Sequence, residues 1–284
     1  MKITKILTVM LLVVGISVQA QEENKTENYL PEAGNFAIGA DASPVFSYIG
    51  NLLSAAGTNS LDLSSPVLYG KYYLDAKTAV RAILYINSAT ADNAYYAQDD
   101  AAVALDPLSN AQVTDVRNVK INEYFLSGGY QKFIGEKRLR GFYGGQLFAN
   151  YSRTMTSYEY GNPMTEFNQA PSTYMGNLAT RPLSVTTVPA TFQIGVGGIA
   201  GFEYFIMPKL CIGGEISLNF VYQHSGQSYT KSEQYISGND TNEVDVAVNP
   251  GSSAFSVQTL RFVPEGTVVP VPVQHAGIYV MFHF

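Results

Sequence analysis

Apolar and polar residues alternate along the C-terminal end of the chain. Its apolar side carries Ala276, Ile278, Val280, Phe282 and Phe284, and the opposite side carries His275, Gly277, Tyr279, Met281 and His283. A period of two predicts a β-strand with two unlike faces, because successive side chains point to opposite sides. Roughly 9–11 residues of tilted strand cross the hydrocarbon core of a bilayer. Soluble domains usually end on frayed, polar residues, so this aromatic end favours a strand that faces lipid over an edge strand of a soluble sandwich.

The same alternation recurs in seven further segments. They span Asn35–Ala42, Val67–Leu74, Thr78–Asn87, Val119–Phe133, Arg140–Thr156, Thr187–Ile206 and Leu210–Gln223. Turns of about three to six residues follow the second, fourth and sixth segments, whereas connections of about twenty to forty residues follow the others. Long connections at one end only are unusual in a soluble domain and usual in outer-membrane barrels. Residues 45–56 fit either a helix or a longer first strand, and Ala254–Phe262 is an additional strand candidate.

Several segments are rich in glycine, such as GFYGG at residues 141–145, which also holds two aromatic residues, and CIGGE at residues 211–215. With the uneven connections and the terminal strand, the chain resembles the small eight-stranded outer-membrane barrels of the OmpA/OmpX type over about residues 35–284. The resemblance implies an all-β fold, an eight-stranded antiparallel up-and-down transmembrane β-barrel with short periplasmic turns and long extracellular loops. It also implies a membrane insertion signal formed by Ile278, Val280, Phe282 and Phe284.

Residues 1–20 predict a secretory signal peptide. Lys2 and Lys5 give a positive start, an apolar run follows, and Val18-Gln-Ala20 fits a small-residue cleavage site. The run is too short for the ~20 residues of a membrane-spanning helix. We therefore expect export, a periplasmic lead-in at residues 21–34 and the barrel at residues 35–284. The expected partners are outer-membrane lipid, lipopolysaccharide and the barrel assembly machinery.

Composition agrees with an exported β-protein. Charged residues make up 14% of the chain, against ~25% in soluble domains. The net charge of −6 disfavours binding to nucleic acid, which requires a basic face. A single cysteine, Cys211, excludes an internal disulfide, and we expect it to be a small apolar residue within a strand.

Charged residues gather on the faces opposite the apolar stripes. This set comprises Asp41, Lys71, Arg81, Glu123, Glu203 and Glu215. Eight strands enclose a space that side chains just fill, so charges placed there must pair. Lys71 and Arg81 flank one short turn and Glu203 and Glu215 another, which predicts similar depths and contacts across the lumen. The cluster is interpreted as a structural polar plug or, as the OmpA-type resemblance suggests, as ion pairs that gate a narrow ion path.

Other signals for chemistry are weak. His275 and His283 share a strand face but lie roughly 27 Å apart, too far to share a metal ion. The glycine-rich string at residues 195–200 matches G-x-G-x-x-A, but no helix follows it. His224 with an acidic residue of the last loop would imitate a rim-active outer-membrane enzyme, although no spacing supports this. We therefore expect no enzymatic activity, cofactor or metal.

The favoured function is a structural or surface-interaction role through three long loops. These are Ser88–Arg117, Tyr158–Ser184 and Gly226–Val268. The alternatives are a narrow channel for ions or small solutes and, behind it, the rim-active enzyme. A secreted β-sandwich is the second architecture, in which the apolar stripes would form a core between two sheets.

Overall fold

The computed structural model describes residues 29–42, 45, 48, 67–236, 239–259 and 277–284. The predicted signal peptide, most of residues 45–56 and His275 lie outside the described residues. The described part is almost entirely antiparallel β-structure, which confirms the expected all-β class, with one short helix, α3 (Asp100–Leu105). Within it, no helix has the length and apolar character that crossing a membrane requires.

The described residues form thirteen strands, more than the eight predicted. Their bounds are β1 Phe36–Asp41, β2 Val67–Asp75, β3 Thr78–Gln98, β4 Gln112–Ile134, β5 Leu139–Glu159, β6 Ser172–Thr173, β7 Gly176–Asn177, β8 Thr180–Met207, β9 Leu210–Ser225, β10 Ser228–Ile236, β11 Asn239–Asn249, β12 Ser252–Thr259 and β13 Gly277–His283.

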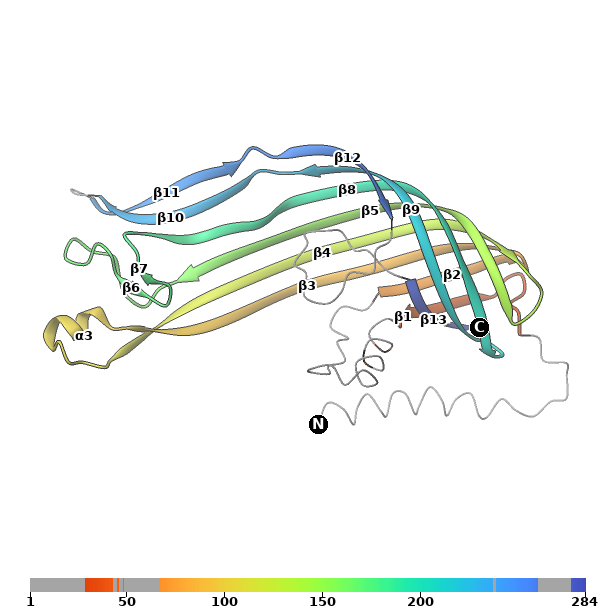
Figure 1. The fold of residues 1–284 in the computed structure, drawn as a ribbon, viewed down its shortest axis with the longest axis horizontal. Helices are drawn as coiled ribbons and strands as arrows, with labels where there is room; N and C mark the ends of the chain where they lie inside the picture. The colour runs from red at the N-terminus through yellow and green to blue at the C-terminus, as the bar shows by residue number, and fades with distance from the viewer. Residues whose placement is uncertain (1–28, 43–44, 46–47, 49–66, 237–238, 260–276) are drawn as a thin grey trace.

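Eight of these strands pair in a circuit that returns to its first member. β1 pairs with β2, and the pairing continues through β3, β4, β5, β8 and β9 to β13, which pairs with β1 again. Every pair is antiparallel, and Gly39 of β1 lies opposite Tyr69 on one side and Met281 on the other. We call these strands the eight-strand ring. Figure 1 shows them curling together at the end of the molecule that holds the C-terminus.

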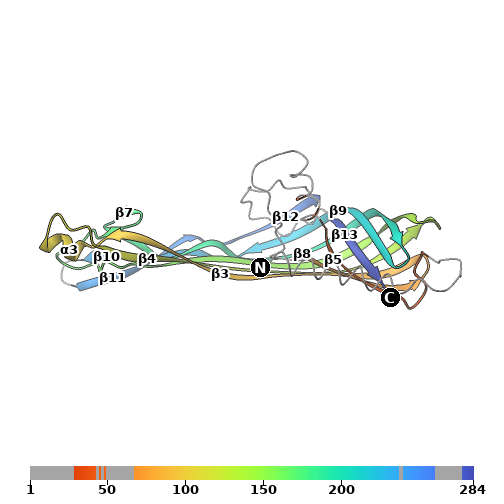
Figure 2. The ribbon, with the colours of Figure 1, turned by 90° about the horizontal axis from the view of Figure 1, so that it is seen from below.

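Four strands of the ring continue far beyond it. β3, β4, β5 and β8 contain 21, 23, 21 and 28 residues, whereas β1, β2 and β13 contain 6, 9 and 7. β2 pairs with β3 only as far as Tyr85. Beyond that point the long strands, joined by β10 and β11 next to β8, form what we call the distal sheet. Figure 2 shows it as a thin layer that extends away from the ring.

The distal sheet corrects the expectation of three irregular loops. Most of Ser88–Arg117 and of the described part of Gly226–Val268 is strand, because β3 and β4 run into the first and β10, β11 and β12 lie within the second, whereas Tyr158–Ser184 is irregular over most of its length, as expected. Residues 88–94 of β3 are exposed on both faces. A strand with two wet faces has no hydrophobic period, so its sequence carries no signal while its backbone still pairs with its neighbours.

In the ring, burial follows the sequence pattern. Inside lie Ala37, Val67, Tyr69, Tyr73, Ala79, Ile83, Phe125, Phe133, Phe142, Ile199, Phe205, Cys211, Tyr279 and Met281. The outer face exposes large apolar side chains, including Ile38, Leu68, Leu84, Ile86, Leu126, Leu147, Val196, Phe202, Ile216, Leu218 and Phe220. In β13 the buried residues alternate with the half-exposed Ile278, Val280 and Phe282. Phe284 is exposed and stacks on Phe36, with ring centroids 4.8 Å apart.

Close approach of β4 and β5 requires glycine at one position. A Cβ atom on Gly144 would lie 1.9 Å from the backbone oxygen of Tyr130, whereas one on Gly128 would meet nothing within 4 Å.

We predict that Gly144→Ala lowers the free energy of unfolding by about 1–3 kcal/mol through overpacking. Gly128→Ala is the matched control, with an expected change within about 0.5 kcal/mol. Urea unfolding in detergent, followed by circular dichroism, measures both, and equal midpoints would contradict the assigned strand contact.

Candidate functional site

A buried carboxylate, Glu203 of β8, occupies the centre of the ring. Its Oε2 atom accepts hydrogen bonds from Nη2 (2.8 Å) and Nε (3.1 Å) of Arg140 on β5. Its Oε1 atom accepts from the Tyr279 hydroxyl (3.0 Å) and from Lys71 of β2. The side chains of Glu203, Lys71 and Arg140 are at most 1% exposed, so one acid is shared by two bases without solvent.

A second ion pair joins Arg81 of β3 to Glu215 of β9. Nη1 and Nη2 of Arg81 donate to Oε2 and Oε1 of Glu215 at 2.6 and 2.7 Å, and the two side chains are 1% and 4% exposed. β3 and β9 do not pair with one another, and neither do β2 and β8. Both contacts therefore cross the interior and connect non-adjacent walls of the ring.

The two remaining members of the predicted cluster lie elsewhere. Oε2 of Glu123 on β4 accepts hydrogen bonds from the Tyr85 hydroxyl (3.1 Å) and Asn87 Nδ2 (3.0 Å), and Glu123 lies opposite Asn87, just beyond the part of β3 that pairs with β2. Asp41 ends β1 opposite Tyr279 and is half-buried. The structure thus brings Lys71 together with Glu203, which Arg140 also contacts, and Arg81 together with Glu215.

Arg140 is the interior residue that the sequence reading missed. It follows a basic turn, where Lys137 and Arg138 are exposed. The sequence pattern identifies it only as the first residue of a strand. Alternation carries the missing signal, since Arg140 and the buried Phe142 share a face opposite the exposed Tyr143. Its guanidinium carbon lies 3.7 Å from the centroid of the Phe133 ring, and Nη2 donates to the Tyr73 hydroxyl at 3.0 Å.

Polar groups continue along the interior of the β4–β5 wall. Gln131, Ser127, Gln146 and Asn150 each hold a buried side-chain atom with no hydrogen-bond partner among the described residues. Gln131 lies opposite Gly144, and Asn150 opposite Phe125, farther from the turn that joins the two strands. Buried polar groups of this kind are usually satisfied by ordered water, so the interior beyond the ion pairs has a polar, water-compatible wall.

The far end of the distal sheet carries a compact polar assembly. We call residues 99–111 and 161–177 the distal head; it contains α3 and the β6–β7 hairpin (Figure 1). Oδ2 of Asp100 accepts hydrogen bonds from Asn168 Nδ2 (2.6 Å) and the Ser172 amide (2.8 Å), which ties the two segments together. Asn162, only 2% exposed, donates to the carbonyl groups of Gln98 (2.7 Å) and Ser172 (2.8 Å).

The head is fixed to the sheet by further side chains. Asp115 of β4 is fully buried, and its carboxylate accepts from the amides of Gly161 (2.9 Å) and Tyr174 (3.0 Å). The Tyr174 ring stacks on Tyr95 of β3 with centroids 4.3 Å apart. Arg181 of β8 donates to the Asn162 carbonyl at 2.8 Å. These contacts join residues that are far apart in the chain, so no local sequence pattern predicts them.

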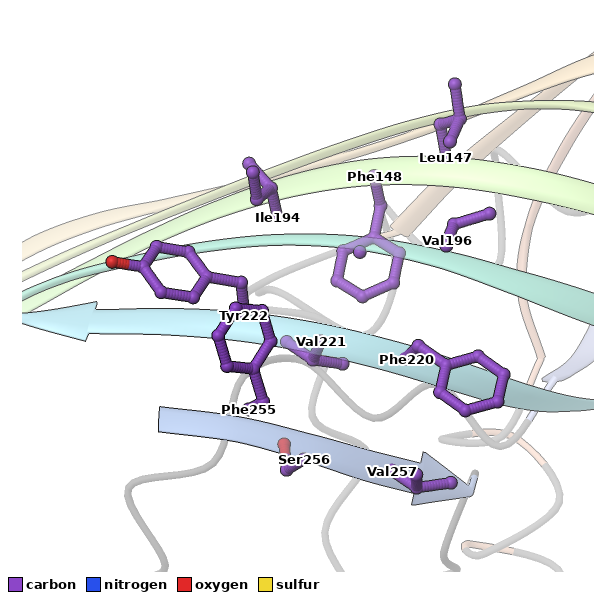
Figure 3. A pocket seen from close by; sticks show the side chains of 11 residues that line it. Leu147, Phe148, Ile194, Val196, Phe220, Val221, Tyr222, Phe255, Ser256 and Val257 are labelled. Atoms are coloured by element: carbon purple, nitrogen blue, oxygen red, sulfur yellow. The ribbon is translucent and has the colours of Figure 1, made fainter. Parts of the chain in front are cut away.

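An apolar cleft lies where β12 joins the sheet. Its volume is about 600 Å³, and side chains from β5, β8, β9 and β12 line it, as Figure 3 shows. Ser256 is the single polar side chain besides the Tyr222 hydroxyl, and the cleft holds no charged group. Phe255 and Val257 at its edge are 84% and 61% exposed. The mostly apolar lining suits contact with apolar groups.

The two histidines in the part of the chain that the structure describes, His224 and His283, have separate partners. Nδ1 of His224 shares a hydrogen bond of 2.9 Å with the Ser253 hydroxyl, and both residues are exposed. Nε2 of His283 shares one of 2.9 Å with the Tyr73 hydroxyl inside the ring. In the described ranges, no group of three His, Cys, Asp or Glu residues is placed to hold a metal ion. Cys211 is buried.

No family model and no curated protein matches the chain. Among solved structures, it is similar to the outer membrane protein OprG from Pseudomonas aeruginosa. The identity is 11%, the match covers 89% of this chain and 97% of OprG, and the TM-score is 0.28. A superposition this loose assigns neither fold nor function, so the proposals below rest on the strand pairing and side chains of this chain.

We predict that Arg81→Met destabilises the protein by about 3–5 kcal/mol, because it leaves Glu215 buried without a counter-charge. Adding Glu215→Gln to that variant should recover much of the loss. Lys77→Met is the control, since Lys77 pairs with Glu136 at 2.8 Å with both side chains mostly exposed, and it should leave unfolding unchanged. Urea midpoints in detergent measure all three variants; a wild-type midpoint for Arg81→Met would show that the pair does not hold the ring.

The distal head should loosen in acid. Burial alone would raise the pKa of Asp100, but hydrogen bonds from Ser172 and Asn168 outweigh it and hold the pKa below its usual value. A carboxyl group whose pKa is lowered by folding stabilises the head above its unfolded pKa of about 3.9, and this contribution is lost as the pH falls through the folded pKa. A spin label at Gln169→Cys should therefore become mobile below about pH 4. Asp100→Asn should give a mobile label at every pH; a pH step retained in that variant would assign it to another group.

Proposed function

We propose that the eight-strand ring is a transmembrane β-barrel of a bacterial outer membrane. The protein is then a non-enzymatic surface protein whose distal sheet and head project from the cell. One observation carries this proposal: the ring has charged groups inside and an apolar outer face. A soluble protein buries its apolar side chains and exposes its charged ones. A protein that spans a membrane must instead present apolar side chains to the lipid.

The ring meets two physical requirements of a membrane span, closure of the backbone pairing and an apolar outer face, although β1 and β13 contain 6 and 7 residues against the roughly 9–11 that cross a bilayer. Its backbone groups pair around a circuit, which leaves no open strand edge to face hydrocarbon. Exposed side chains such as Leu84, Leu126 and Val196 form the apolar face, while Glu203 and Glu215 are paired inside. A secreted sandwich would need the apolar stripes to meet between two sheets, but these stripes lie on the outside of a curled single sheet.

The lengths of the strands define what lies outside the membrane. Roughly 9–11 residues of strand cross a bilayer, and β8 contains 28. β3 continues through residues 86–98 beyond its pairing with β2, a length of roughly 40 Å at the rise of a strand. Residues 88–94, which are exposed on both faces, belong in water, on the side opposite the short turns. The insertion-signal residues Ile278, Val280 and Phe282 would contact lipid, and the outer-membrane partners would be lipid, lipopolysaccharide and the barrel assembly machinery.

A narrow channel is the second candidate, favoured by the polar groups along the β4–β5 wall. Gln131, Ser127 and Asn150 would line a water path, and the ion pairs of Glu203 and Glu215 would interrupt it. Conductance of the purified protein in planar bilayers separates this role from a purely structural interior. Steps of current that change in Glu215→Gln would favour the channel, and a silent bilayer would favour the surface role.

Cysteine labelling tests the proposed orientation. The sole native cysteine, Cys211, is buried, so an introduced thiol reports its own location. We predict that Ala170→Cys in the distal head reacts with a membrane-impermeant maleimide on intact Gram-negative cells. Lys137→Cys, in the exposed turn between β4 and β5, should react only after the cells are opened. The reverse pattern, or a protein that folds in buffer without detergent, would contradict the proposal.

A further inference from the structure

Three large apolar side chains of the distal head are almost completely exposed. Leu105 is 90% exposed, Leu108 86% and Phe167 98%. Single exposed apolar residues are common, but several on one small element mark interaction surfaces. The membrane does not cover these side chains in the proposed orientation, because the whole length of the distal sheet separates them from the ring (Figure 1).

Phe167 is held in place by local hydrogen bonds. The amide and carbonyl groups of Thr165 and Asn168 bond reciprocally at 3.1 and 3.2 Å, so Phe167 stands at the corner of a closed tight turn. The Asn168 side chain then donates to Asp100, at the start of the helix whose last residue is Leu105. The backbone segments that carry Phe167 and Leu105 thus belong to one braced unit, so little backbone entropy remains to be lost there on binding.

Leu108 is displayed in a similar way. It follows Pro107 in a turn in which the Asp106 carboxylate accepts from the Leu108 amide at 3.0 Å and the Asp106 carbonyl accepts from the Ser109 amide at 2.9 Å. This turn begins one residue after Leu105. Two leucines are therefore presented from consecutive, internally bonded segments.

The charge around these side chains has one sign. The distal head contains Asp99, Asp100, Asp106 and Glu166 and no lysine or arginine. Asp106 and Glu166 are exposed and directly follow or precede the apolar residues Leu105 and Phe167. Two arginines reach the head from the sheet: Arg181 of β8 is 3% exposed and paired with Glu233, and Arg117 of β4 interacts with Tyr95 and Tyr174 where the head meets the sheet. The residues of the head itself carry only negative charge, which attracts cationic partners and repels anionic ones.

We propose that the distal head docks a basic polypeptide segment that also carries apolar side chains. Leu105, Leu108 and Phe167 supply the apolar contact, and Asp106 and Glu166 supply charge complementarity. An anionic membrane or lipopolysaccharide surface would be repelled, and so would the equally acidic head of a second copy. The inference rests on the proposed function, since only a head outside the cell meets such a partner.

The test uses the full chain in phosphatidylcholine nanodiscs and three fluorescent synthetic peptides. One combines lysine and leucine amphipathically, one replaces leucine with serine at equal charge, and one replaces lysine with glutamate. Binding to empty nanodiscs is subtracted. The lysine–leucine peptide should bind in a salt-sensitive manner. The triple variant Leu105→Ser, Leu108→Ser and Phe167→Ser should weaken binding about ten-fold or more, as expected for loss of central anchors.

Two further variants separate charge from general effects. Asp106→Asn with Glu166→Gln should weaken binding and flatten its dependence on salt, because screening acts on the removed charges. Tyr96→Ser is the matched control: this aromatic residue of β3 is 73% exposed just before the head and should leave binding unchanged. Circular dichroism and heat-modifiable gel migration confirm that each variant is folded.

Several results would overturn the inference. These are unchanged binding by the triple variant, equal binding of the lysine–serine peptide, head-dependent binding to anionic vesicles, or head-dependent self-association. If the peptide fails to bind while Ala170→Cys is labelled on intact cells, the docking inference alone is wrong. If Ala170→Cys is not labelled there, the proposed function is wrong as well.

Discussion

The arrangement of the ring depends on the charge of Glu203 being neutralised inside it. A carboxylate without solvent is costly unless it is paired, and here a lysine from β2 and an arginine from β5 share it. The pairing draws opposite walls together and lets the interior be polar while the outer face is apolar. Arg81 and Glu215 repeat the same solution between β3 and β9. A closed circuit of strands with an apolar outer face is stable only if the charged groups that it encloses are paired.

The molecule combines two environments within continuous strands. Near the C-terminus the strands of the ring alternate between apolar and interior residues, and β1, β2 and β13 end after a few residues. β3, β4, β5 and β8 continue beyond the ring and keep their pairing, and residues 88–94 of β3 are exposed on both faces. The change in residue type along one strand therefore marks the boundary between lipid and water in the proposed orientation.

Sequence pattern predicted the parts of the fold in which the two faces of a strand differ. Val80, Leu84 and Ile86 alternate with Arg81 and Ile83, and the structure places the two groups on opposite faces. The pattern failed beyond residue 87, where both faces are wet and extended pairing leaves no periodic trace. The sequence pattern does not place Arg140 inside the ring, because the charged residues of the neighbouring turn obscure where the alternation of the strand begins. The contacts of Asp115 and Asn162 were beyond reach, because they join segments 46 and 64 positions apart.

The uninterrupted β3–β4 ladder has a mechanical consequence. Every residue of β3 from Thr78 to Gln98 is in register with one of β4, from within the ring to the base of the distal head. β3 leads from the ring to the head and β4 leads back, so tension between the two ends would be shared by both backbones in parallel. The hydrogen bonds between the two strands lie perpendicular to them and hold them side by side. A force applied to the distal head would therefore reach the eight-strand ring through continuous strands, without a flexible joint between them.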